Sequence, residues 1–303
     1  MAEVPLDLRW FANEDFRFRL GTVPGSAEAF FRRSPESAKI LAERHHWLST
    51  DARRYAALLP GGNEIADEFL SVAATWNELA DSRDKLIDVT VEPFQRLRLA
   101  SELLEPDLVL LAPQHADPGT TMTGSQSEPG KSTEAMQGVV PEFRVIGGCV
   151  CFPSGWRLTD KLGLRLSEVH ETVPGLNASL RVPIDRLMAQ LRPGKCVIRA
   201  NWGVSSLSEL NQHLDRFIPS IAPPLTLDSA WLRREDQLLF TLPRTRAVVF
   251  GIRVDPISWR ALRSEPAAAR SVARTLRTMP PEMLAYKRLT GLAEELARLL
   301  DDA

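Results

Sequence analysis

The stretch Trp231–Pro243, WLRREDQLLFTLP, decides the fold of this chain. Successive residues of a strand point to opposite faces, so every second residue here shares one face: Trp231, Arg233, Glu235, Gln237 and Leu239. The next stretch, Arg246–Val254 (RAVVFGIRV), is apolar throughout, and the link Pro243-Arg244-Thr245 is short enough for a hairpin. We therefore predict two neighbouring antiparallel strands, the first of which carries polar side chains on one face.

Three further stretches have the character of strands. Lys195–Val204 (KCVIRANWGV) places Arg199 and Asn201 on the face opposite to that of Trp202. Leu108–Leu111 and Phe143–Pro153 are predicted as buried strands, and Gly147-Gly148 in the latter predicts a bulge or a close approach by another group. Antiparallel strands with helices around them predict an α+β fold.

The sequence predicts mainly helices and loops for the rest of the chain. We predict three parts: residues 1–95 as an N-terminal arm and helices packed on the core, 96–255 as the core, and 256–303 as a C-terminal helical layer. One of the N-terminal helices is expected over Thr50–Leu59. Within the core, residues 113–138 are rich in Gly, Ser, Thr, Pro and Gln, and are predicted to form a flexible insertion because they cannot bury enough apolar area to fold.

Composition excludes several classes of protein. The chain has 303 residues, and its 37 basic and 39 acidic residues give a net charge of -2, so no global field favours nucleic acid or an anionic membrane surface. We see no signal peptide and no apolar run of about 18 residues. Three cysteines, an odd number, favour the reducing cytosol. Cys149 and Cys151 are more consistent with core thiols than with a metal site.

A histidine stands out in Gly155–Asn177, GWRLTDKLGLRLSEVHETVPGLN. If a helix begins at Lys161, one apolar stripe holds Leu162, Leu166, Val169 and His170. Such a histidine is either a core residue whose ring nitrogens are satisfied by backbone groups or a ligand that points into an apolar pocket.

The motifs of common enzyme classes are missing from the sequence. It has no P-loop, no GxGxxG after a strand, no HExxH and no GxSxG, and the adjacent His45 and His46 make a poor metal pair. What remains is one histidine on an apolar helix facing a sheet that carries polar side chains. One axial imidazole in an apolar pocket with distal polar groups is what haem binding requires.

Several blocks of sequence, in order between about Trp47 and Lys287, resemble the haem-dependent oxidative N-demethylase α-subunit family. They are Phe152-Pro153-Ser154-x-Trp156, Lys161-x-Gly163-x-x-Leu166-x-x-Val169-His170-x-x-Val173-Pro174, Arg199-x-Asn201-Trp202, Leu232-Arg233-x-Glu235-x-Gln237-x-Leu239 with Leu242-Pro243, and Met283-x-x-Tyr286-Lys287. The resemblance implies a haem-binding PAS-like antiparallel sheet with added helices. It also implies an enzyme that oxidises a small amine with O₂ and electrons from a separate reductase.

Carried over to this chain, the resemblance makes His170 the proximal ligand of a haem b iron, with Lys161 and Trp202 as further cofactor-binding residues. It also implies a polar distal pocket in which an arginine stabilises the negative charge of bound oxygen and a carboxylate holds an ammonium substrate. The candidate catalytic residues are Arg199, Asn201, Arg233, Glu235 and Gln237. The alternative is that these side chains face outward or form a structural Arg–Glu pair.

Two functions remain for such a haem protein. The first is an oxidative enzyme, and because we see no FMN, iron–sulfur or NADPH motif, it implies a reductase partner. The second is a haem PAS module that senses a gas without turnover. A sensor normally needs an output domain, and the terminal helices show no sign of one, so the sequence favours the enzyme.

Overall fold

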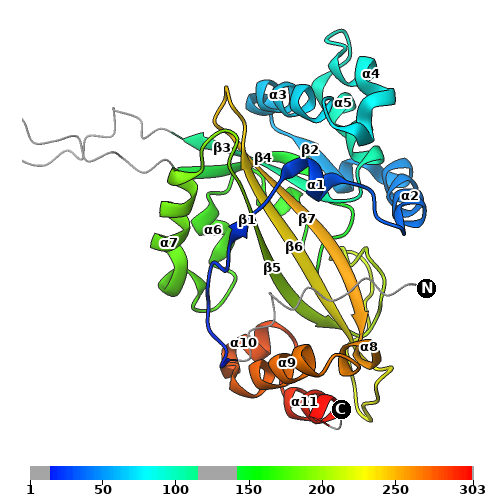
Figure 1. Cartoon of the computed structure of the whole chain (residues 1–303), viewed down its shortest axis with the longest axis vertical. Coiled ribbons are helices and arrows are strands. Elements are labelled where there is room, and N and C mark those ends of the chain that lie inside the picture. The colour runs from blue at the N-terminus through cyan, green and yellow to red at the C-terminus, as the bar shows by residue number, and fades with distance from the viewer. Residues whose placement is uncertain (1–13, 115–141, 302–303) are drawn as a thin grey trace, which may run out of the picture.

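The computed structural model describes residues 14–114 and 142–301 and confirms the α+β class (Figure 1). Its centre is an antiparallel sheet of seven strands in the order β1-β5-β6-β7-β3-β4-β2. The strands are β1 (Val23–Pro24), β2 (Ala56–Leu58), β3 (Asp107–Gln114), β4 (Glu142–Cys149), β5 (Cys196–Ser205), β6 (Trp231–Thr241) and β7 (Val248–Ser258). Most of the predicted insertion, 115–138, lies outside the described residues.

Helices surround the sheet in three groups (Figure 1). The first, near the ends of β2 and β3, contains α1 (Ala27–Phe31), α2 (Ser37–Tyr55), α3 (Asn63–Ala73), α4 (Arg83–Ile87) and α5 (Pro93–Leu103). The second contains α6 (Leu166–His170) and α7 (Leu176–Gln190). The third, at the opposite end, contains α8 (Trp259–Arg263), α9 (Pro266–Thr278), α10 (Pro281–Tyr286) and α11 (Ala293–Asp301). Short 3₁₀ turns cover Pro60–Gly62, Asn77–Ser82 and Thr159–Lys161.

The predicted strands are present, although β4 ends at Cys149 and not at Pro153. The hairpin between β6 and β7 is also present, and Thr241 pairs with Val248 in it. The helix predicted over Thr50–Leu59 is correct only as far as Tyr55. Asp51 interrupts α2 with a φ of -156° and a ψ of 80°, the helix ends at Tyr55, and residues 56–58 form β2. This segment is extended because it pairs with β4 at Gly147–Cys149, a tertiary contact that overrides local helix preference.

The glycine pair in β4 provides both features that were expected of it. The register slips there, since Leu110 faces Gly147 while Leu111 faces Val145, which leaves Ile146 as an extra residue. A Cβ on Gly147 would lie 2.7 Å from the carbonyl oxygen of Ala57, and one on Gly148 would lie 2.3 Å from that of Leu108. Only glycine therefore fits between β2 and β3 here.

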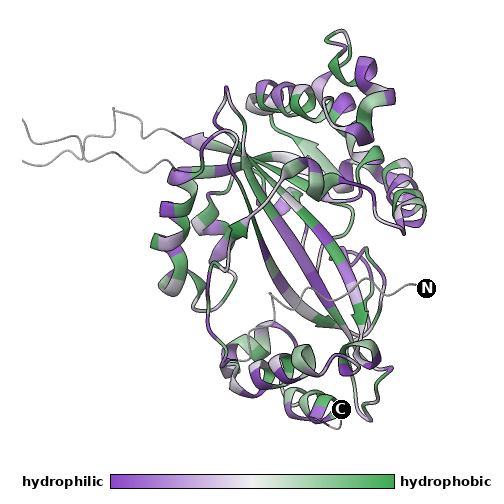
Figure 2. Cartoon of the chain, in the orientation of Figure 1, coloured by the Kyte–Doolittle hydropathy of each residue, from purple (hydrophilic) through white to green (hydrophobic). Residues whose placement is uncertain are grey.

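The hydrophobic contacts are divided among the helix groups. Figure 2 shows hydrophilic residues along the middle of β6 and more apolar ones toward its end near β3. The C-terminal helices bury their own apolar cluster around Trp259, whose indole nitrogen donates to the carbonyl of Leu296 at 3.0 Å. No helix within the described ranges is long and apolar enough to span a membrane.

The cysteine pair lies in the core, as expected. Cys149 and Cys151 are buried and not disulfide-bonded, with their sulfurs 4.0 Å apart. Beside them the carboxylate of Asp107 accepts from the backbone N–H groups of Cys151 and Phe152 at 2.8 and 2.9 Å, and from Arg44 at 2.8 Å. This buried cluster ties β3 to α2 and to the segment that follows β4.

Candidate functional site

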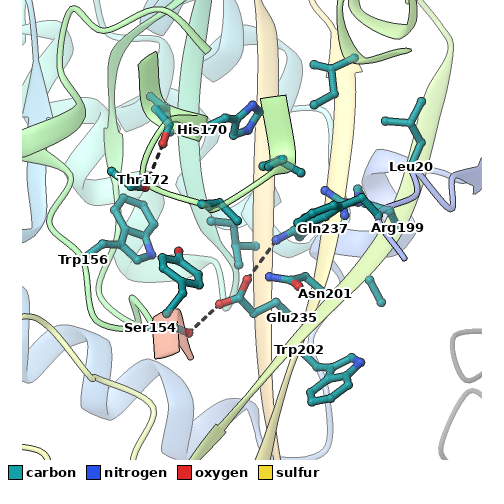
Figure 3. Close-up of a pocket in the computed structure, with 18 of the residues that line it drawn as sticks. Leu20, Ser154, Trp156, His170, Thr172, Arg199, Asn201, Trp202, Glu235 and Gln237 are labelled. Atoms are coloured by element: carbon teal, nitrogen blue, oxygen red, sulfur yellow. Dashed lines mark hydrogen bonds between the residues drawn. The ribbon is translucent and has the colours of Figure 1, made fainter. Parts of the chain in front are cut away.

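A cavity of about 670 Å³ lies against one face of the sheet, between β5–β7 and helices α6, α7 and α10. The strand register decides which side chains reach it. Arg199 pairs with Gln237 and Asn201 pairs with Glu235, so these four side chains share one face. All four line the cavity together with His170, and Figure 3 shows them from β5, β6 and α6.

His170 reaches the cavity from a shorter helix than the sequence predicted. Gly163 has a φ of +77°, which breaks the helix expected from Lys161, and α6 begins only at Leu166. The apolar stripe survives this correction, because Leu162, Leu166 and Val169 still pack in one cluster.

The ring of His170 is available to a ligand. Burial lowers its pKa to about 4, and the nearby charges of Arg199 and Lys161 act in the same direction. The imidazole is therefore neutral at pH 7 and keeps a nitrogen lone pair. Within 14–114 and 142–301, no side chain or backbone group forms a hydrogen bond with this ring. The fully satisfied core histidine considered above is thus not what the structure shows.

Arg199 and Gln237 line the cavity, and each has one buried polar atom without a partner among the described residues. Burial lowers the pKa of Arg199, although the charge of Glu235 opposes this. Its Nε is buried without a partner among the described residues, and so is Oε1 of Gln237 on the adjacent strand. Because Arg199 and Gln237 pair across β5 and β6, both atoms belong to the part of the cavity wall that these two strands form.

Glu235 is the carboxylate in the cavity wall that β5 and β6 form. Ser154 Oγ donates to its Oε1 at 2.6 Å and Gln237 Nε2 donates to its Oε2 at 3.0 Å (Figure 3). Each carboxylate oxygen also has a second lone pair, which remains for a group in the cavity. Asn201, directly opposite on β5, is exposed on the same face.

Arg233 belongs to the same strand but does not line the cavity. It is 2% exposed, and all three nitrogens of its guanidinium donate to other groups. The acceptors are Ser154 Oγ at 3.0 Å and the carbonyl oxygens of Glu209, Phe152 and Leu210 at 2.7, 3.1 and 2.8 Å. The structure thus separates this arginine from the other four predicted catalytic residues.

The two remaining predicted residues, Lys161 and Trp202, are both at the cavity. Lys161 lies beside His170, close enough for its charge to lower the pKa of the imidazole. Trp202 belongs to the other face of β5 and lines the cavity at the strand edge. Its carbonyl accepts from Lys287 Nζ at 2.8 Å, and the same ammonium lies 5.6 Å from its ring centroid.

A family model described as haem-dependent oxidative N-demethylase, alpha subunit-like, matches residues 63–297. The chain belongs to this family. The matched range contains every one of the predicted site residues and most of the sheet. Membership identifies the protein as related to haem-dependent oxidoreductase subunits.

The N-demethylase-like match leaves out one wall of the cavity. Residues 14–20 line it as an extended arm that precedes β1 and lies before the matched range. The backbone N–H of Phe16 donates to Thr278 Oγ1 on α9 at 2.7 Å, and β1 pairs with Val197 and Ile198 on β5. Sequence reasoning missed this role, since an irregular aromatic segment does not indicate which surface it covers.

Two further cavity residues, Tyr286 at the end of α10 and Lys287 directly after it, were not predicted from the sequence. Tyr286 and Lys287 both line the cavity, and burial lowers the pKa of Lys287 against the opposing charge of Glu235. The block Met283-x-x-Tyr286-Lys287 was the available signal, because it forms part of the resemblance to the N-demethylase-like family.

The donor set fits the haem that the family name implies. The described part of the chain holds no group of three or more His, Cys, Asp or Glu side chains able to bind a bare metal ion. Haem iron needs only an axial protein ligand, and His170 offers a neutral, unpartnered imidazole in a cavity. Apolar side chains form much of the opposite lining, including Val109, Leu239, Phe250 and Ile252.

Proposed function

We propose that this protein is an oxidative enzyme that binds haem b through His170 and oxidises a small amine with O₂. The observation that carries the proposal is the pairing, across one cavity, of an unpartnered neutral histidine with a wall containing Glu235 and Arg199. Membership of the N-demethylase-like family supports the same reaction.

The core is proposed to be of the PAS type. Its five long strands lie in the order β5-β6-β7-β3-β4, and α6 and α7 come between β4 and β5 in the chain. Helices inserted there cover the face that carries Glu235, which is the face a haem must contact if His170 ligates it. The remaining helices are additions to this core.

Each residue of the wall has a separate task in the proposed reaction. Haem, when bound through His170, supplies the redox chemistry with dioxygen. Arg199 places a half-buried cation at the cavity, where it stabilises negative charge that develops there. Glu235 accepts hydrogen bonds from the ammonium form of the substrate, and Asn201 and Gln237 Oε1 offer further polar atoms beside it. The apolar lining excludes water.

The electrons are proposed to come from a separate reductase subunit. The family name describes an alpha subunit, which agrees with a multi-subunit assembly.

We also propose that the protein works in the cytosol, because its three free cysteines agree with a reducing compartment.

An absorption spectrum tests the central claim. Protein supplied with haem should show a Soret band that His170→Ala shifts or abolishes, while His46→Ala, on the outer part of α2, should leave it unchanged. An unchanged band in His170→Ala would show that this residue is not the ligand. Turnover is then measured as formaldehyde release from a panel of small N-methylamines with a chemical reductant and O₂. Oxygen binding without product from any amine would favour the sensor.

A further inference from the structure

The carboxylate of Glu235 is held by a chain of hydrogen bonds whose direction is fixed. Arg233 Nε is always a donor and gives its hydrogen to Ser154 Oγ at 3.0 Å. A serine hydroxyl has a single proton, so Ser154 gives its own to Glu235 Oε1, at 2.6 Å. The chain therefore runs from Arg233 through Ser154 to Glu235 and cannot reverse.

The start of this chain is anchored to the backbone. Arg233 donates to carbonyl oxygens of Phe152, Glu209 and Leu210, which belong to two separate loops. The loops are also joined directly, since Gly155 N donates to the Gln212 carbonyl at 2.8 Å. Because it is held at several points, the guanidinium does not follow movements of the carboxylate.

The chain also keeps two opposite charges apart. Glu235 and Arg199 are diagonal neighbours on adjacent strands, a distance that long side chains can span. Yet Arg199 Nε has no partner in the described part of the chain, while Glu235 is held toward Ser154. Without the Ser154 bond, only Gln237 Nε2 holds the carboxylate, which can then turn toward Arg199 and pair with it.

We propose that Ser154 and Arg233 are positioning residues that hold the Glu235 carboxylate in place for an amine cation and away from Arg199. The proposal rests on the proposed function in one respect, since it takes Glu235 as the group that meets the substrate. Arg233 then has a role in the reaction although it does not reach the cavity.

Amine binding gives the first test. The probe is dimethylammonium, the cation of the smallest secondary amine, and binding to haem-loaded protein is followed by the Soret band or by calorimetry. Ser154→Ala should weaken binding about fivefold, and Ser154→Thr, which keeps the hydroxyl at an exposed position, should stay within about twofold of the wild type. Ser206→Ala is the matched control, because that hydroxyl donates to the Pro219 carbonyl instead.

A double-mutant cycle separates positioning from general damage. If Ser154 acts through Glu235, the effect of Ser154→Ala on amine binding should vanish in a Glu235→Gln background. Equal losses in the two backgrounds would overturn the proposal.

Carbon-13 NMR of the haem-free protein tests the chain without the proposed activity. With ¹³C-labelled glutamate, the carboxyl resonance of Glu235 is the one that disappears in Glu235→Gln. It should move in Ser154→Ala and in Arg233→Lys, and stay in place in Ser206→Ala. A resonance that does not move in Ser154→Ala overturns the proposal. If the resonance moves as expected but the protein neither binds nor oxidises amines, the restraint on Glu235 is supported. The proposed function is then refuted.

Discussion

Two arginines on the same sheet face mark two regions of different character. Arg233 lies where the loops around Ser154 and Leu210 meet the sheet, and Arg199 lies at the cavity. Burial lowers the pKa of both, to about 10 for Arg233, and the charge of Glu235 opposes the shift in both. The two arginines therefore share Glu235 as a nearby charge, while Asp107 and Glu43 act on Arg233 in addition.

The difference between the two regions is in hydrogen-bond partners. Arg233 donates to four acceptors, whereas Arg199 Nε has no partner among the described residues. A buried arginine whose three nitrogens all donate holds the surrounding structure together, whereas a half-buried arginine at a cavity can bind a ligand there. We call the surroundings of Arg233, where its nitrogens are all hydrogen-bonded, the closed region, and the cavity wall at Arg199 the open region. Three substitutions test this division.

The largest expected effect on stability comes from Arg233→Met. The substitution leaves the carbonyls of Phe152, Glu209 and Leu210 without this donor, so the free energy of unfolding should fall by about 3 kcal/mol or more. Urea unfolding of the haem-free protein measures the change. A loss below about 1 kcal/mol, the value of one ordinary hydrogen bond, would contradict the assignment.

A smaller effect on stability is expected at Glu68, another buried charged side chain whose oxygens accept hydrogen bonds. Its two oxygens accept from the backbone N–H groups of Arg244 and Thr245 at the β6–β7 turn. Burial raises the pKa of Glu68, but the hydrogen bonds from Thr245 and Arg244 outweigh burial and lower the pKa below its ordinary value. Glu68→Gln should lower the free energy of unfolding by about 1 kcal/mol at pH 7.

The lowered pKa of Glu68 determines how this stabilisation depends on pH. Near the ordinary glutamate pKa of about 4.3 the unfolded chain binds more protons at this position than the folded chain, so acid removes the stabilisation. The wild type should lose more stability than Glu68→Gln as the pH falls from about 5 through the lowered pKa. If the free energy of unfolding fell by the same amount with pH in both proteins, the lowered pKa of Glu68 would be contradicted.

The smallest effect on stability is expected for Arg199→Met. This substitution removes a half-buried cation whose Nε has no partner among the described residues, so the free energy of unfolding should change by less than about 0.5 kcal/mol or should rise. Amine oxidation by the haem-loaded protein should nevertheless fall by about 100-fold, because a preorganised donor is lost. A stability loss as large as that of Arg233→Met would remove the distinction between the two regions.

Much of the open region was predictable from alternation along the strands. Residues at positions i and i+2 share a face, which correctly grouped Glu235 with Gln237, and Arg199 with Asn201. The hairpin link between β6 and β7 was equally visible, because it is short and contains Pro243. The apolar stripe around His170 also held, since it depends on side-chain spacing more than on an unbroken helix.

The closed region was not predictable in the same way. Alternation placed Arg233 with Glu235, but nothing local indicates that carbonyls from residues 152 and 209–210 receive its hydrogens. The helix expected from Lys161 failed because the chain adopts a positive φ at Gly163, where its backbone joins β4 through Val145. The segment after Tyr55 became a strand for the same kind of reason, since its partner is about 90 residues away.

The arm before β1 has a consequence for how the cavity opens. Its residues 14–20 and the residues of α10 form walls of the same cavity although they come from opposite ends of the chain. A ligand that fills the cavity stabilises only the state in which both walls are in place, so it couples their local unfolding. Amide hydrogens in the arm and in α10 should then exchange more slowly together when the cavity is filled, and each becomes a reporter of the other.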